Sequence, residues 1–147
     1  MTFNWGALAG CAAVTGAIDW AVCGPLFAGC GFWTLVYDTL YAHQDKADDV
    51  KIGVRSSALA LGDAYTKPAL TAFAGAAVAG WAGAGAAAGL AWPFYAGVAG
   101  AGGHLLWQVW TADLDDPNSL APRFKANALV GAGLFASAVA GSAVAGM

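Results

Sequence analysis

Charged side chains are confined to a few short stretches of this chain, and long apolar stretches separate them. Residues 1–18, 20–37, 68–112 and 126–147 contain no Lys, Arg, Asp or Glu. A helix needs about 20 mainly apolar residues to cross the hydrocarbon core of a membrane, so each stretch is a candidate transmembrane segment. The pattern predicts an all-α, polytopic membrane helix bundle.

Turn signals divide these stretches into about five predicted transmembrane helices. The predicted spans are residues 3–18 and 23–41, two helices within 68–112, and 124–146. A Gly24-Pro25 pair is a turn signal between the first two spans, and the Gly-Leu-Ala-Trp-Pro sequence at 89–93 divides the 45-residue run. We expect one membrane domain over residues 1–147, with a hydrated acidic loop from Asp113 to Ser119.

The basic residues predict the orientation of the bundle. All six lie in two connections that two membrane crossings separate, so the connections share one side: Lys46, Lys51, Arg55 and Lys67 in one, Arg123 and Lys125 in the other. This distribution satisfies the positive-inside rule. Six of the seven tryptophans are expected near span ends, as interfacial residues: Trp5, Trp20, Trp33, Trp92, Trp107 and Trp110. Trp81 is the exception.

Composition supports a membrane protein and argues against two other classes. The chain is 59% hydrophobic and 10% charged, against roughly 25% charged residues in soluble domains. Its 12% aromatic content is unlike that of disordered chains. A net charge of -3 with six basic residues gives little basis for binding a nucleic acid backbone. The three cysteines are expected to be small apolar residues, and the GxxxG pattern at 85–89 indicates close helix packing.

The candidate chemistry lies in residues 37–57. Asp38, Asp45 and Asp49 are spaced by seven and four, so they share one face if the second span continues as a straight helix past the membrane surface. Asp48 then points away from them. Clustered carboxylates repel one another unless a cation lies among them, and hard oxygen ligands suit Mg²⁺.

A basic rim accompanies these carboxylates. Lys46, Lys51 and Arg55 lie beside them in the sequence. Basic side chains bind phosphate oxygens, so the pattern favours a site that binds a diphosphate together with Mg²⁺. A solvated loop of mixed charge is the alternative interpretation. Asp38, at the end of a membrane helix, favours the functional one, because ionisable residues there are costly and mark functional sites.

At these residues the sequence resembles a known family. The stretch YDTLYAHQDKADDVKIGVRSSAL, Tyr37 to Leu59, is similar to the second aspartate-rich motif of the UbiA superfamily of intramembrane prenyltransferases, and within it of members that act on 4-hydroxybenzoate in ubiquinone synthesis. Weaker collinear similarity occurs at 4–10 and 66–68, and at His104, Gln108, Thr111, Asp113, Phe124 and Asn127. The resemblance covers the whole chain as the C-terminal half of a fold of about nine helices.

The resemblance implies a reaction and roles for individual residues. A polyprenyl chain would pass from polyprenyl diphosphate to 4-hydroxybenzoate, with Mg²⁺ as cofactor. Asp45 and Asp49 would be the DxxxD ligands of Mg²⁺, Asp38 a further ligand or orienting carboxylate, and Tyr41 a cavity-facing residue. The diphosphate would contact basic residues of the motif, with Lys46, Lys51 and Arg55 as candidates.

The family's first aspartate-rich motif does not occur in this chain. Three explanations stay open: the sequence is part of a longer enzyme, a second protein chain supplies the rest, or the chain is a non-catalytic subunit of a larger membrane complex. The resemblance implies the mitochondrial inner membrane, or the plasma membrane in bacteria. His43 is expected to pack behind the site, and His104 to be a neutral helix-bonded histidine with Gln108 as its candidate partner.

Overall fold

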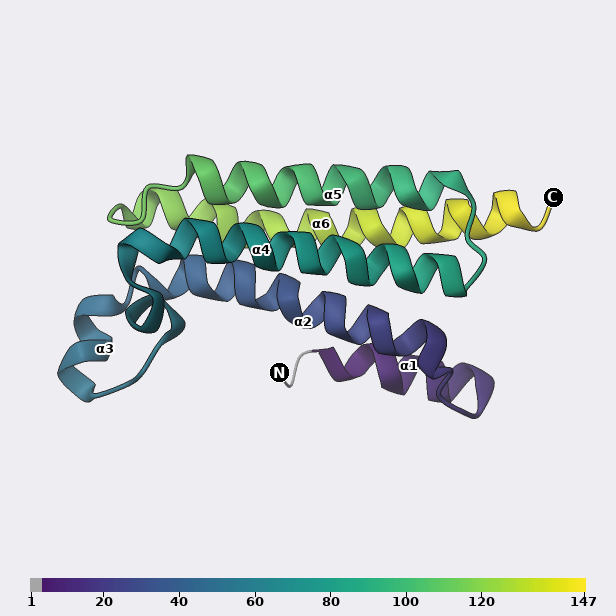
Figure 1. Ribbon diagram of the computed structural model, residues 1–147, viewed down its shortest axis with the longest axis horizontal. Coiled ribbons are helices and arrows are strands. Elements are labelled where there is room, and N and C mark those ends of the chain that lie inside the picture. Colours follow the sequence, from purple (N-terminus) through teal and green to yellow (C-terminus); the bar gives the residue numbers. More distant parts are fainter. Residues whose placement is uncertain (1–3) are drawn as a thin grey trace.

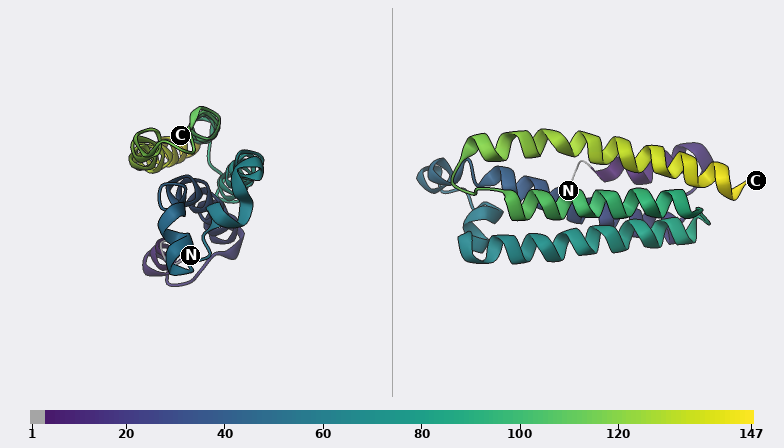
Figure 2. Two further views of the ribbon diagram at one scale, coloured as in Figure 1. Left: turned by 90° about the vertical axis from the view of Figure 1, so that its left-hand side faces the viewer. Right: turned by 90° about the horizontal axis from the view of Figure 1, so that it is seen from above.

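The computed structural model describes residues 4–147, which form six α-helices and no strand. In chain order these are α1 (Trp5–Thr15), α2 (Trp20–Ala42), α3 (Lys46–Ile52), α4 (Ser57–Ala87), α5 (Trp92–Thr111) and α6 (Pro117–Ala145). The four long helices form an elongated bundle, α1 lies against the start of α2, and α3 lies at one end (Figure 1). Viewed from above, α4, α5 and α6 run side by side along its length (Figure 2). The predicted all-α bundle is confirmed.

Fewer helices than the five expected combine the length and the apolar character typical of a membrane span. In the described part of the chain, three helices are long and apolar enough to cross a membrane: α2, α4 and α6. Helix α1 has 11 residues and reaches only about 16 Å, roughly half the hydrocarbon thickness. The expected start of this span at residue 3 lies outside the described residues. Helix α5 has 20 residues, but four glycines, a histidine and a glutamine make it less apolar.

The predicted turn at Gly24-Pro25 is wrong, because α2 already begins at Trp20 and runs through Pro25. Asp19 caps the helix, and its side chain accepts a hydrogen bond of 3.0 Å from the Ala21 N–H. Proline has no N–H to bond the carbonyl four residues earlier, and here that carbonyl belongs to the exposed Ala21. The early position of the proline explains why the helix tolerates it.

Two other helices also begin earlier than the apolar pattern predicts. Helix α4 starts at Ser57, eleven residues before Pro68, and a kink at Gly62 bends its first turns. Helix α6 starts at Pro117, seven residues before Phe124, with Asp116 accepting from the Asn118 N–H at 2.9 Å. Proline is favoured at the first position of a helix because that N–H has no helical partner. The hydrated loop is therefore shorter than expected.

The basic residues share one end of the bundle, as predicted. The end of α2, the whole of α3, the start of α4 and the α5–α6 connection all lie at this end (Figure 1). We call it the polar end. The opposite end, where α4 turns into α5, carries no Lys or Arg among the described residues. This asymmetry agrees with a helix bundle oriented by the positive-inside rule.

Small residues let the helices approach closely. A Cβ added to Gly80 would lie 2.7 Å from the Pro25 carbonyl oxygen and 2.8 Å from the Gly29 Cα, so α2 and α4 touch backbone to backbone. Gly85 holds the Phe94 ring, whereas Gly89, with φ +65°, lies in the turn that follows α4. The GxxxG pattern therefore marks close packing at its first glycine and a chain reversal at its second.

Two tryptophans lie in the interior. Trp81 is 1% exposed, in agreement with its expected absence from the span ends. Trp33 was expected at a span end, but it lies near the middle of α2, half-buried, with its ring edge to face with that of Trp81. The prediction for Trp33 is wrong because Trp33 lies well inside α2, which runs from Trp20 to Ala42.

Candidate functional site

The acidic motif, which consists of Asp38, Asp45 and Asp49, spans the point where α2 stops. Residues 43–45 form a turn in which the Gln44 N–H bonds the Tyr41 carbonyl at 2.9 Å and the Asp45 N–H bonds the Ala42 carbonyl at 3.3 Å. Helix α3 then starts at Lys46 in a new direction. The straight helix assumed from the sequence is therefore wrong. Asp38 stays on α2 and does not share a helix face with Asp45 and Asp49.

Asp45 and Asp49 lie close together at the start of α3. Asp45 is the N-cap residue, its backbone carbonyl accepts from the Asp49 N–H at 2.8 Å, and its side chain makes no capping hydrogen bond. Asp49 lies in the first turn of the helix. Both carboxylates are therefore placed one helical turn apart at the polar end.

The donor chemistry fits Mg²⁺ only as a partial site. Within residues 4–147, neither hydrogen bonds nor ion pairs engage the side chains of Asp38, Asp45 and Asp49, and no three His, Cys, Asp or Glu residues are grouped closely enough to hold a metal. Mg²⁺ commonly takes one or two protein carboxylates and completes its shell with waters and substrate phosphates. The pair Asp45 and Asp49 fits that mode, whereas a cage of three carboxylates does not form.

The basic residues of the motif differ in their partners. Lys51 pairs with Asp48 at 2.8 Å, and both side chains are more than 70% exposed. Lys46 instead pairs with Asp63 of α4 at 2.5 Å, and its side chain is 27% exposed. Arg55 is exposed, and none of the ion pairs found in the described chain includes it. Asp48 thus points to solvent, as predicted.

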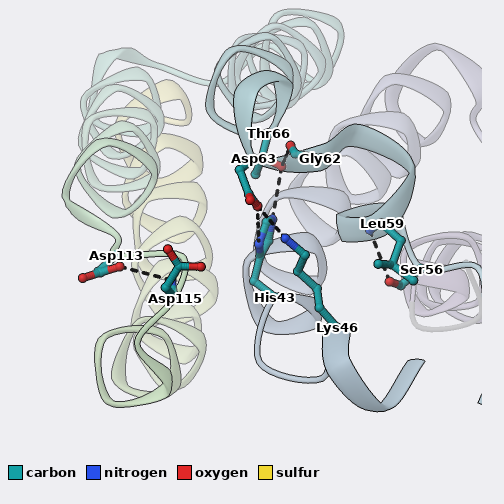
Figure 3. Close-up of polar contacts among 9 residues, drawn as sticks. All are labelled: His43, Lys46, Ser56, Leu59, Gly62, Asp63, Thr66, Asp113 and Asp115. Carbon is teal, nitrogen blue, oxygen red and sulfur yellow. Dashed lines mark hydrogen bonds and ion pairs between the residues drawn. The ribbon is translucent and has the colours of Figure 1, made fainter. Parts of the chain in front are cut away.

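A buried histidine stands behind this motif. His43, at the end of α2, is 6% exposed, and its Nε2 lies 3.1 Å from the Thr66 hydroxyl (Figure 3). That hydroxyl donates to the Gly62 carbonyl at 2.7 Å, so the Nε2–H of His43 is the donor to Thr66. Burial, and then the Lys46 cation, lower the pKa of His43 below its usual value. The histidine packs behind the motif, as expected.

Sequence reasoning did not single out Asp63. Its side chain lies 3.7 Å from His43 Nδ1 in addition to its pair with Lys46 (Figure 3). One signal was present in the sequence, because a glycine within a helical pattern often marks a special backbone conformation. Gly62 directly precedes Asp63 and has φ 63° and ψ 172°, a region that only glycine adopts readily.

Aromatic residues form the wall between α2 and α6, next to the motif. Phe124 contacts Tyr37, with ring centroids 5.7 Å apart, and Tyr41, at 4.9 Å. A pocket of about 360 Å³, lined by Tyr37, Phe124, Lys125 and others, opens here. A second, apolar pocket of about 280 Å³ follows along the same two helices, with Trp33 common to both. We call this pair of pockets the α2–α6 seam.

Buried amides hold the seam together. The indole N–H of Trp33 donates to Asn127 Oδ1 at 2.8 Å, and Asn127 Nδ2 donates to Gln108 Oε1 at 3.2 Å. The expected pairing of Gln108 with His104 is therefore wrong, because Gln108 faces α6. His104 instead lies against the Trp107 ring, with centroids 5.4 Å apart. Its Nε2 is buried without a partner in the described chain, so the expected helix-to-helix bond is not formed.

The later acidic residues cap local backbone, as predicted for a hydrated loop. Asp113 Oδ1 accepts from the Asp115 N–H at 3.1 Å, and Asp116 caps α6. Arg123 closes this connection, since it donates to the Thr111 carbonyl at 2.7 Å and to the Ser119 hydroxyl at 2.7 Å. The α5–α6 connection is thus a structural element beside the motif.

Comparison with known proteins gives a consistent result. A model of the UbiA prenyltransferase family matches residues 1–144. The chain is 48% identical over 141 residues to 4-hydroxybenzoate polyprenyltransferase, mitochondrial, of Arabidopsis thaliana, which covers 96% of this chain and 34% of that protein. Identity to the proteins of the same name is 44% in Drosophila melanogaster and 42% in Homo sapiens, each over 97% of this chain and 36% and 38% of the relative.

These relatives are much longer than this chain. The chain spans about a third of their length, which is less than the half expected from the resemblance. No solved structure is significantly similar to it.

Proposed function

Because the chain belongs to the UbiA prenyltransferase family, we propose that it forms part of an enzyme that transfers a polyprenyl chain from polyprenyl diphosphate to 4-hydroxybenzoate. The observation that carries the proposal is the pair of free carboxylates, Asp45 and Asp49, one helical turn apart at the polar end. The names of the similar proteins support the same substrates and a mitochondrial membrane, for which we propose the inner membrane.

Asp45 and Asp49 would hold Mg²⁺ together with the diphosphate. The bound ion would act as a Lewis acid that offsets the charge of the departing diphosphate. The Asp45 side chain is free for this role because the cap of α3 uses only its backbone carbonyl. Asp38, which lies on α2 before the turn, would serve as a further ligand or orienting carboxylate.

Arg55 and Lys51 would bind the diphosphate oxygens. Arg55 is exposed beside α3, and a guanidinium can bind phosphate oxygens with two parallel hydrogen bonds. Lys51 can turn from Asp48 toward a diphosphate at little expense, since an exposed ion pair of this kind stabilises by only about 0–1 kcal/mol. Lys46 is already paired with Asp63.

The α2–α6 seam would accept the polyprenyl chain. Its far pocket is lined by apolar side chains, including Leu26, Phe94 and Leu134, and its near pocket opens beside Tyr37. Tyr41 contacts Phe124 of this wall and lies four residues before Asp45 along the chain. An apolar, aromatic wall excludes water from the reacting carbon.

The remaining parts of the site would come from outside these residues. We propose that a further segment or a second protein chain in the membrane supplies them, together with the first aspartate-rich motif. We do not favour the alternative, a non-catalytic subunit of a larger complex, because a scaffold needs neither free carboxylates on α3 nor an open seam beside them.

The test is Mg²⁺-dependent prenylation of 4-hydroxybenzoate by detergent-extracted protein that contains this chain. We expect Asp45→Asn/Asp49→Asn to abolish turnover while the protein still assembles. Asp19→Asn is the control: it makes the same kind of change, with one carboxylate charge removed instead of two, at the start of α2, where asparagine caps a helix as well as aspartate does.

The outcomes separate the two interpretations. Turnover that the double variant loses and the control keeps supports a working metal motif. Equal turnover in all three proteins, or none in the intact wild type, would refute catalysis through Asp45 and Asp49.

A further inference from the structure

We propose that Asp63 is a positioning residue, which anchors the turn and helix that carry the acidic motif through its ion pair with Lys46. Lys46 then holds the motif in place and does not contact the diphosphate. The effect of this anchor on catalysis rests on the proposed function. It changes the role of one of the three basic residues and adds a residue of α4 to the site.

The backbone of α4 is built to present Asp63. Gly62 has φ 63° and ψ 172°, inside an otherwise helical segment from Ser57 to Ala87. A residue with a Cβ strongly disfavours this conformation, so the kink depends on glycine. It bends the first turns of α4 so that Asp63 faces the end of α2 (Figure 3).

The Asp63 carboxylate pairs with Lys46 and lies near, but does not hydrogen-bond, His43. Its Oδ1 lies 2.5 Å from Lys46 Nζ and 3.7 Å from His43 Nδ1 (Figure 3). His43 is itself fixed, because it is buried and donates to Thr66, one turn further along α4. The Asp63 carboxylate therefore ties the start of α3 to α4, and the His43–Thr66 hydrogen bond ties the end of α2 to the same part of α4.

The location of Lys46 makes this pair an anchor for the metal ligands. Lys46 is the first residue of α3 and directly follows Asp45. Fixing its side chain limits the motion of the Asp45 backbone and of the helix that carries Asp49. By contrast, residues 50–55 are exposed, so few packing contacts restrain the rest of this segment.

Lys46 and Lys51 differ in their partners and in their exposure to solvent. The Lys51 pair is between neighbours on one short helix, and both side chains are largely exposed. The Lys46 pair joins residues 17 positions apart, and the lysine is mostly covered. A lysine that turned to the diphosphate would leave the Asp63 carboxylate without its cation beside the buried His43, which makes Lys46 the poorer candidate ligand.

A double-mutant cycle tests the anchor. The variants are Lys46→Met, Asp63→Asn and both together, in the protein that contains this chain. We would measure the Mg²⁺ concentration for half-maximal prenyl transfer and the hydrogen exchange of amides 43–56. Each single change should raise the half-maximal Mg²⁺ concentration and the exchange rate of these amides by about threefold, the scale of one partly exposed ion pair. The double variant should show the same values as the single variants.

Two further variants separate an anchor from a general structural effect. Asp63→Glu keeps the carboxylate and should restore both readouts to near the wild-type values, because Asp63 is 64% exposed and has room for one more methylene. Asp115→Asn removes an exposed charge at the same end and should change neither readout. Exchange of α4 amides beyond Thr71 should stay the same in all variants.

The results that overturn the anchor are distinct from failure of the proposed function. A rise in KM for polyprenyl diphosphate in Lys46→Met but not in Asp63→Asn would show that Lys46 is a diphosphate ligand. Unchanged exchange at 43–56 in both single variants would also refute the anchor. Absence of prenyl transfer in the wild type refutes the proposed function alone, since the exchange cycle needs no turnover.

Discussion

Helix α2 meets α4 and α6 in two different ways. Against α4 the contact is made of backbone on backbone: Gly80 has no room for a methyl group, and one added at Gly29 would lie 3.0 Å from the Ala77 carbonyl oxygen. Against α6 the contact is made of side chains, with the Trp33–Asn127 hydrogen bond between two pockets of about 360 and 280 Å³. Helix α2 is therefore sealed against α4, with no space between the backbones, and open toward α6, where pockets remain.

The difference separates structure from function within one bundle. In a membrane, apolar side chains gain little by leaving lipid, so close backbone packing is a main source of helix association. The α2–α4 contact supplies it. The α2–α6 seam instead leaves an apolar space that ends beside the acidic motif, which is the shape that a long isoprenoid chain with a charged head requires.

The largest expected effect comes from filling the sealed contact. We expect Gly80→Leu to lower the free energy of unfolding by about 3 kcal/mol, because the new side chain would meet the backbone of Pro25 and Gly29. Unfolding in SDS, followed by circular dichroism, measures this. Gly75→Leu on the same helix has open space at its Cβ and should unfold like the wild type. Similar losses of unfolding free energy in Gly80→Leu and Gly75→Leu would contradict the close α2–α4 contact.

A smaller effect is expected from the polar link across the seam. Asn127→Leu removes the acceptor of Trp33 and the donor to Gln108, and leaves both buried groups without partners. We expect a loss of about 2 kcal/mol in the same SDS titration. Ser137→Ala is the control, since within residues 4–147 that hydroxyl bonds only the Leu134 carbonyl of its own helix. An unchanged unfolding curve for Asn127→Leu would mean that the link does not hold the seam.

Filling the open seam should affect activity more than folding. Ala138 lines the apolar pocket between α2 and α6, so Ala138→Phe would occupy space proposed for the polyprenyl chain. We expect kcat/KM for a long polyprenyl diphosphate to fall on the order of tenfold. Ala136→Phe, an exposed position on the same helix, should leave the rate unchanged. If Ala138→Phe keeps the wild-type rate, the chain lies elsewhere.

The smallest expected effect isolates one hydrogen bond. Trp33→Phe keeps an aromatic ring in the seam but removes the N–H that bonds Asn127. We expect a loss of about 1 kcal/mol in unfolding. The double variant with Asn127→Leu should be no less stable than Asn127→Leu alone, because the two changes remove the same bond. Additive losses would show that Trp33 stabilises the seam through its ring instead.

Much of the bundle could be predicted from the chain alone. The charge-free runs indicate where α2, α4, α5 and α6 lie, and the Gly-Leu-Ala-Trp-Pro sequence marks the turn between α4 and α5. Helix starts were less predictable. Ser56 and Asp116 cap helices that begin in partly polar sequence, which a search for apolar runs overlooks. Asp19 caps α2 in an apolar stretch, where the Gly24-Pro25 pair wrongly indicated a later start.

The site was predictable in its residues but not in its shape. The DxxxD spacing of Asp45 and Asp49 survives because both lie within one turn of α3. The relation to Asp38 does not, because three residues of tight turn separate α2 from α3. No local rule signals that turn.

The sequence by itself determined that this is a helical membrane protein with its basic residues at one end and a DxxxD pair like that of the UbiA family, since these properties depend on neighbours within a turn or on the solubility of whole segments. The tertiary structure decided that Lys46 pairs with Asp63, that Trp33 bonds Asn127, and that α2 is sealed on one side and open on the other. Those contacts join residues 17 and 94 positions apart, and which partners meet depends on how closely each pair of helices can approach.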